Sequence, residues 1–128
     1  MNLGLEGLVA AVTGGSEGIG RAVAATLAAE GCDVAIGARR AEPLDQAAEA
    51  IRAATDRRVE PLQMDVTDSQ QARGFIADAV MHLGRLDILV NNAGTSAAAR
   101  FEDVDDEAWE DDLRLKVYGA IRCTRAAI

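Results

Sequence analysis

A glycine-rich loop is the first feature of this sequence with the residue types to bind a ligand. Residues 13–20 read Thr-Gly-Gly-Ser-Glu-Gly-Ile-Gly and follow an apolar segment, residues 8–12. Glycines at such a junction allow a sharp turn, close approach of the backbone to a ligand, and close packing of the next helix. Free N–H groups at that helix's beginning bind phosphate. We therefore predict a diphosphate site rather than a merely flexible turn, with Glu17 pointing to solvent. Its expected residues are Gly14, Ser16, Gly18, Ile19 and Gly20.

The segments that position this loop alternate between short apolar stretches and stretches with helical spacing. Expected strands are 8–12, 32–37, 59–64 and 86–90, and expected helices are 18–30, 42–55, 67–83 and 105–128. Apolar strands that alternate with amphipathic helices indicate a parallel sheet covered on both faces. We predict an α/β fold, a Rossmann-type doubly wound parallel sheet truncated after four strands and the helix following the fourth. Residues 1–128 then form one dinucleotide-binding domain, incomplete at its C-terminal end.

Polar residues mark where two of these helices begin. Thr67, with Gln70 three positions later, has the spacing of a capping box. Asp105 is expected to cap the last helix, with negative charge in its first turn where the helix dipole favours it. That helix is expected to run unbroken to Ile128.

Composition and charge narrow the possible partners. The chain has 128 residues, a formal net charge of −8 and only 3% aromatic residues. An acidic surface with few aromatic side chains argues against nucleic acid and against anionic membranes. We find no apolar stretch approaching the roughly 20 residues of a membrane span and no signal-like segment, and therefore expect a cytoplasmic protein.

We expect no metal site. Cys32 and Cys123 are far apart in the sequence and should be buried small side chains in a reducing compartment. The acidic residues between 102 and 112 lack the glycine and the spacing of a calcium loop. They are typical of a solvated helix beginning.

Three motifs together resemble the short-chain dehydrogenase/reductase family. They are the glycine loop at 13–20, Asp65-Val66 and Asn91-Asn92-Ala93-Gly94, at the ends of the first, third and fourth expected strands. The resemblance covers essentially the whole chain. It implies a Rossmann-type domain, a nicotinamide cofactor, and interconversion of a carbonyl and an alcohol in a small-molecule substrate.

The resemblance also implies roles for individual residues. Backbone at Ser16, Gly18 and Ile19 would follow the phosphates and ribose of the cofactor. Asp65 would accept a hydrogen bond from the adenine amino group, and Val66 would close the adenine pocket. Asn92, Ala93 and Gly94 would pass beneath the adenosine ribose, while Asn91 would tie the fourth strand to its neighbour.

The end of the second expected strand favours NADP(H) over NAD(H). A carboxylate there would bind the ribose hydroxyls and repel a 2′-phosphate, but Ala38 occupies this position. Arg39 follows, and its guanidinium can grip a 2′-phosphate and stack over adenine. Arg40 is the expected auxiliary residue. Alternatively, the two arginines merely begin a solvated helix.

The catalytic serine and Tyr-x-x-x-Lys motif implied by the resemblance lie beyond a fifth strand, and this chain contains neither. We therefore identify no catalytic residue and expect the chain alone to be inactive. Tyr118 and Arg122 mimic the spacing, but they precede the fifth strand and arginine is not a tunable lysine. Lys116 stands where many members of the family have asparagine.

Two other classes of function are compatible with a doubly wound nucleotide-binding fold. A non-catalytic NADP(H)-binding module is the alternative to an NADP(H)-dependent oxidoreductase. A methyltransferase binding an adenosyl cofactor is disfavoured, because Arg39 would then have no phosphate to bind and residues 91–94 no explanation. The last helix contributes subunit contacts in the resembling family, which implies a homo-dimer or homo-tetramer.

Overall fold

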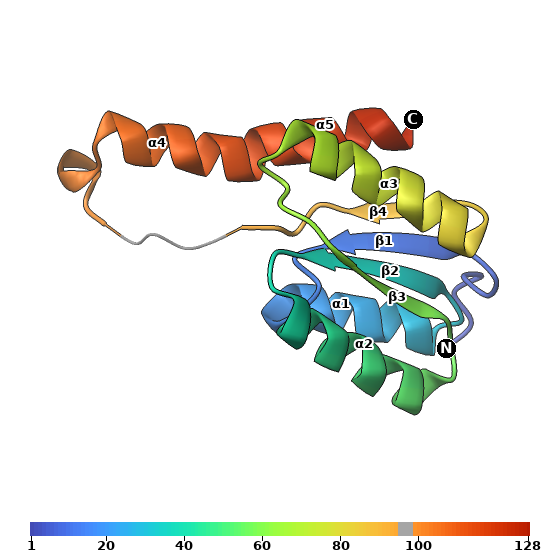
Figure 1. Cartoon of the computed structure of the whole chain (residues 1–128). Helices are drawn as coiled ribbons and strands as arrows, with labels where there is room; N and C mark the ends of the chain where they lie inside the picture. Colours follow the sequence, from blue (N-terminus) through green and yellow to red (C-terminus); the bar gives the residue numbers. More distant parts are fainter. Residues whose placement is uncertain (95–98) are drawn as a thin grey trace.

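Four parallel strands form the centre of the molecule, and helices cover both faces of the sheet (Figure 1). The computed structural model describes residues 1–94 and 99–128. The strands are β1 (Val9–Thr13), β2 (Asp33–Ala38), β3 (Val59–Gln63) and β4 (Ile88–Val90). The helices are α1 (Gly18–Ala29), α2 (Ala41–Thr55), α3 (Ser69–Leu83), α4 (Asp106–Leu113) and α5 (Gly119–Ala127), with a 3₁₀ turn η1 (Phe101–Asp103) and a π turn η2 (Arg114–Tyr118).

The strand order is β3-β2-β1-β4, and every neighbouring pair is parallel. The predicted Rossmann-type α/β arrangement is thereby confirmed. Because all strands run the same way, their carboxyl ends meet at one edge of the sheet. In open α/β sheets, ligands bind at this edge.

Two apolar clusters hold the helices on the sheet. Successive side chains of a strand point to opposite faces, so each strand contributes to both clusters. Toward α1 and α2 lie Ala10, Val12, Val34 and Ile36. Toward α3 and α5 lie Val9, Ala11 and Ala35, together with Phe75, Ile76 and Cys123. Alanines on both faces of the sheet and on the helices allow the layers to approach closely.

The beginning of α3 differs from the capping box predicted at Thr67. Asp68 is the N-cap residue, and its Oδ1 accepts hydrogen bonds from the N–H groups of Gln70 (2.9 Å) and Gln71 (3.0 Å). Thr67 cannot cap because its hydroxyl donates to Asp65 instead. The predicted box at Thr67 and Gln70 is therefore wrong by one position, since a carboxylate one residue later is the competing cap.

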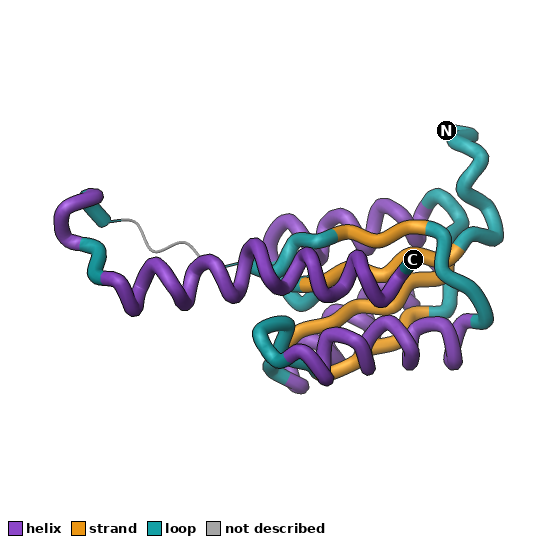
Figure 2. Tube along the Cα trace, turned by 90° about the horizontal axis from the view of Figure 1, so that it is seen from above, coloured by secondary structure: helices purple, strands orange, loops and turns teal. Residues whose placement is uncertain are grey.

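The last helical segment begins as predicted and then departs from a regular helix. Asp105 is its N-cap and accepts a hydrogen bond from the N–H of Ala108 at 2.8 Å. The π turn η2 interrupts the expected α-helix between α4 and α5. Seen from above, this continuous run extends past the edge of the sheet at its α4 end (Figure 2). The extra residue in a π turn changes the register of the side chains that follow it.

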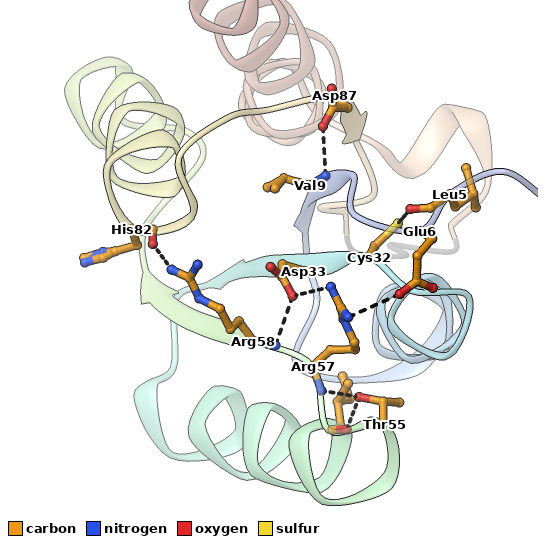
Figure 3. Close-up of polar contacts among 11 residues, drawn as sticks. Leu5, Glu6, Val9, Cys32, Asp33, Thr55, Arg57, Arg58, His82 and Asp87 are labelled. Carbon is orange, nitrogen blue, oxygen red and sulfur yellow. Dashed lines mark hydrogen bonds and ion pairs between the residues drawn. The ribbon is translucent and has the colours of Figure 1, made fainter.

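At the edge of the sheet opposite the carboxyl ends, charged side chains join neighbouring segments through ion pairs and hydrogen bonds (Figure 3). Arg57 reaches Asp33 at 3.0 Å and Glu6 at 3.6 Å, so it connects the N-terminal segment to β2. Asp87 accepts a hydrogen bond from the N–H of Val9 at 2.9 Å, at the beginning of β1. Cys32 beside them is buried, as is Cys123, which confirms the predicted burial of both side chains.

Within residues 1–94 and 99–128, no helix has the length and apolar character needed to cross a membrane. Among these same residues, His, Cys, Asp and Glu side chains form no group of three suited to a metal ion.

Candidate functional site

The glycine loop between β1 and α1 uses its glycines in different ways. Gly14 and Gly18 have positive φ angles of 69° and 59°, which side-chain-bearing residues rarely adopt. Above Gly18 there is open space, since a Cβ there would have no heavy atom within 4 Å. A Cβ on Gly20 would overlap the carbonyl oxygen of Gly14, so α1 packs directly on the loop. The chain thus turns sharply at Gly14, leaves space for a ligand above Gly18, and packs against the beginning of α1 at Gly20.

The end of β4 is fastened to this loop by a residue that the sequence analysis did not single out. The hydroxyl of Thr13 accepts hydrogen bonds from the N–H groups of Asn92 and Ala93, both at 3.0 Å. The side chain of Asn92 donates to the carbonyl of Gly14 at 3.2 Å. A threonine that ends an otherwise apolar strand was the available signal. These bonds place residues 92–94 directly beside the glycine loop.

Asn91 does not have the role expected for it. Its side chain donates to the hydroxyl of Thr124 on α5 at 3.1 Å rather than joining β4 to the neighbouring strand. Thr13 and Asn92 make the connection between strands instead. The correction follows from the position of α5, which the sequence pattern does not reveal.

The end of β2 presents two arginines to solvent. Arg39 and Arg40 are exposed, and Ala38 before them is half-buried. The side chain of Gln63 at the end of β3 donates to the carbonyl oxygen of Arg39 at 2.8 Å, which fixes the backbone at this strand end. The two guanidinium groups therefore extend from a well-held backbone at the carboxyl edge of the sheet.

Asp65 lies in a tight turn after β3 and is held in its ionised form. Its Oδ1 accepts hydrogen bonds from the hydroxyl of Thr67 at 2.6 Å and from the N–H of Thr67 at 2.9 Å. The hydroxyl bond is the main cause that lowers the pKa of Asp65 below its ordinary value; the N–H bond and the charge of Arg39 act in the same direction against partial burial.

These strand ends surround one cleft of about 970 Å³. Every residue predicted for the site lines it except Gly20, which lies beneath the loop. Lining residues from the sequence motifs are Gly14, Ser16, Gly18, Ile19, Arg39, Arg40, Asp65, Val66, Asn92, Ala93 and Gly94. Glu17 is at the rim and exposed, as predicted. The cleft thus brings together motif residues separated by up to 80 positions in the sequence, from Gly14 to Gly94.

One wall of the cleft comes from the helix after β4, and the sequence analysis missed it. This wall contains Ala108, Asp111, Asp112, Arg114 and Leu115. Helical spacing does not say which face of a helix meets a distant loop, so no signal identified these residues. Charged residues of both signs line the strand ends, with Arg39, Arg40 and Asp65, and also this wall, with Asp111, Asp112 and Arg114.

Lys116 lies within the π turn η2, close to Gly94. Its Nζ pairs with both carboxylate oxygens of Asp112, at 3.0 Å and 3.3 Å. A Cβ on Gly94 would lie 3.7 Å from Cε of Lys116, in ordinary van der Waals contact. The aliphatic part of Lys116 therefore covers the backbone that leaves β4.

Comparison with known proteins identifies the family. The family model described as short chain dehydrogenase matches residues 8–128. The chain belongs to the short-chain dehydrogenase family. An uncharacterized oxidoreductase of Methylorubrum extorquens is 42% identical over 124 residues, which are 96% of this chain and 50% of that protein.

Solved structures of short-chain dehydrogenase relatives superpose closely. L-Sorbose reductase of Gluconobacter frateurii, solved with NADPH and L-sorbose, has a TM-score of 0.94 and 34% identity, covering 99% of this chain and 48% of that one. A short chain dehydrogenase of Burkholderia cenocepacia in complex with NADP has a TM-score of 0.89 and 39% identity, covering 96% and 50%. The chain spans about half the length of the relatives that it matches.

Proposed function

We propose that residues 1–128 form the nicotinamide dinucleotide-binding domain of an oxidoreductase that prefers NADP(H) to NAD(H). The observation that carries the proposal is the pairing of an open glycine loop with Arg39, both lining one cleft at the carboxyl edge of the sheet. NADPH and NADP in the two solved relatives support this choice of ligand.

The glycine loop fits a diphosphate. Open space above Gly18 leaves room for phosphate oxygens close to the backbone. The N–H groups at the beginning of α1 have no partner within the helix and carry the positive end of its dipole. These N–H groups can attract an anion locally in spite of the protein's net charge of −8.

The end of β2 fits an adenosine that carries a 2′-phosphate. Ala38 offers no carboxylate that would repel the phosphate, and Arg39 and Arg40 line the same part of the cleft. Asp65, kept ionised by Thr67, is suited to accept a hydrogen bond from the adenine amino group. Val66 lines the cleft and is also packed into the core, so it forms a rigid apolar wall.

The reaction that we propose for the whole enzyme is interconversion of a carbonyl and an alcohol. A bound nicotinamide would supply or accept the hydride. The residues of this chain would bind and orient the dinucleotide, with residues 92–94 forming the floor beside the glycine loop.

We also propose that two copies of the protein associate through the outer face of α4, η2 and α5. Four apolar side chains spaced four residues apart are each between 43% and 45% exposed: Trp109, Leu113, Val117 and Ile121. A continuous apolar stripe of this kind is typical of a helix that packs against a partner.

Titration with reduced dinucleotides tests the cofactor proposal. Nicotinamide fluorescence is expected to report NADPH binding about ten- to a hundredfold tighter than NADH binding, the range of a charge-assisted hydrogen bond. The double variant Ala38→Asp, Arg39→Leu should reverse the preference, because it adds a repulsive carboxylate and removes the guanidinium. Arg73→Leu, an exposed arginine on α3, is the matched control. Equal affinities in the wild type, or unchanged NADPH affinity in the double variant, would contradict the preference.

A further inference from the structure

Arg122 of α5 makes a long-range contact with the turn that follows β3. Its Nη1 donates to the backbone carbonyl of Thr67 at 2.8 Å, across 55 residues of sequence. Its guanidinium carbon lies 5.7 Å from the ring centroid of Tyr118, one helical turn earlier. Arg122 is half-buried and is not among the residues that line the cleft.

Thr67 is the residue that sets the geometry of Asp65. Its hydroxyl and its N–H both donate to Oδ1 of Asp65. Because Arg122 holds the carbonyl of the same residue, Thr67 is restrained through its carbonyl, its amide and its side chain. Rotation of this residue would move the carboxylate of Asp65, which lines the cleft.

A second contact from the same helical run reaches the neighbouring residue. A Cβ on Gly119 would lie 2.9 Å from Cγ2 of Val66, so the backbone of α5 packs directly against that side chain. Val66 lines the cleft as well. The run that begins with Tyr118 therefore supports the Asp65–Thr67 turn at two points, one apolar and one polar.

We propose that Arg122 is a positioning residue for the adenosine half of the bound dinucleotide, acting through the carbonyl of Thr67. This inference rests on the proposed function of the cleft. Tyr118 stacks against the guanidinium and limits its freedom, which is the effect of a cation–π contact at a partly exposed site. Tyr118 and Arg122 thus stabilise the turn beside the cleft, because the guanidinium of Arg122 donates to the backbone carbonyl of Thr67 and packs on the ring of Tyr118.

The test separates the adenosine end of the cleft from its diphosphate end. Adenosine 2′,5′-bisphosphate probes the Asp65–Arg39 region, and inorganic pyrophosphate probes the glycine loop; both affinities are measured by calorimetry on the intact chain. Arg122→Met should weaken the affinity for adenosine 2′,5′-bisphosphate about tenfold, which is the loss expected for one part-buried hydrogen bond. The affinity for pyrophosphate should not change. Arg122→Lys keeps a donor and should recover most of the affinity. Arg125→Met, an exposed arginine on the same helix, is the control.

The outcomes distinguish this inference from the proposed function. If the wild type binds neither probe, the proposed function fails. If the wild type binds both and Arg122→Met binds adenosine 2′,5′-bisphosphate equally well, the role of Arg122 is refuted. Parallel weakening of both probes would also refute it, because that pattern indicates general destabilisation. Should Arg122→Met not fold, Tyr118→Leu is tested in the same way. We expect this variant to lose two- to threefold in affinity for adenosine 2′,5′-bisphosphate and none for pyrophosphate. Unchanged affinity for both probes, or an equal loss for both, would contradict the inference.

Discussion

The hydroxyl of Thr13 accepts a hydrogen bond from the N–H of Asn92 at 3.0 Å and so joins the end of β1 to the end of β4. The same oxygen accepts a second bond from the N–H of Ala93. Thr13 is only 1% exposed, so its hydroxyl is shielded from solvent. The contact decides where residues 92–94 lie relative to the glycine loop.

Replacement of Thr13 by valine keeps the shape of the side chain and removes its oxygen. We expect the variant to lose about 1–3 kcal/mol of unfolding free energy, because two N–H groups lose their acceptor in a buried place. NADPH affinity should fall as well, since the floor of the cleft loosens. Urea unfolding and NADPH titration measure the two effects. Thr13→Ser retains the oxygen and serves as control; equal losses in both variants would show that packing, and not the hydrogen bonds, matters here.

Two helical glycines should respond oppositely to alanine. A methyl group at Gly20 would overlap the carbonyl of Gly14, whereas a methyl group at Gly74 on α3 would meet no heavy atom within 4 Å. Gly20→Ala should therefore cost about 1–3 kcal/mol from overpacking and disturb the loop. Gly74→Ala should stabilise the protein by about 0.5–1 kcal/mol, since alanine is the better helix former. Thermal unfolding of both variants checks the signs, and a stabilised Gly20→Ala would mean that α1 does not rest on the loop.

The hydrogen bond from Thr67 predicts how Asp65 titrates. Because this bond lowers the pKa of Asp65 in the folded state, it stabilises the fold above the unfolded carboxyl pKa of about 3.9. That contribution is lost as the pH falls through the lower, folded-state pKa. Thr67→Val should raise the pKa of Asp65 toward its ordinary value, and Thr67→Ser should leave it low. An NMR titration of the carboxyl carbon reads this directly, and an unchanged pKa in the valine variant would assign the effect to other groups.

The sequence predicted the site residues best where a chemically distinctive motif directly follows a strand. The glycine loop, Asp65 and residues 92–94 each follow a recognisable strand, and parallel strands must end at one edge. Their shared cleft follows from that topology. Gly20, which was also predicted for the site, packs against the carbonyl of Gly14 and does not line the cleft.

The remaining features depend on distances that helical periodicity does not encode. Asp68 displaces Thr67 as the cap of α3 only because Thr67 is already bonded to Asp65. The π turn η2 and the contact of Arg122 with Thr67 require knowledge of how the last helix crosses the sheet. The spacing of Tyr118 and Arg122 in the sequence suggested a comparison with catalysis, while their actual partner lies 55 residues earlier.

The apolar stripe on the last helical run predicts self-association of this chain. At low concentration, sedimentation velocity should give the monomer mass of 13.4 kDa, and at higher concentration a species of about twice that mass. Leu113→Glu places a charge within the stripe and should keep the protein monomeric, because burying an unpaired carboxylate is costly. Ala77→Glu on the exposed side of α3 is the matched control and should associate like the wild type. If the wild-type chain stays monomeric throughout the concentration range, the proposed interface is wrong, because the exposed stripe then has no partner in a second copy. It is also wrong if Leu113→Glu associates like the wild type, because a charge within the interface should prevent association.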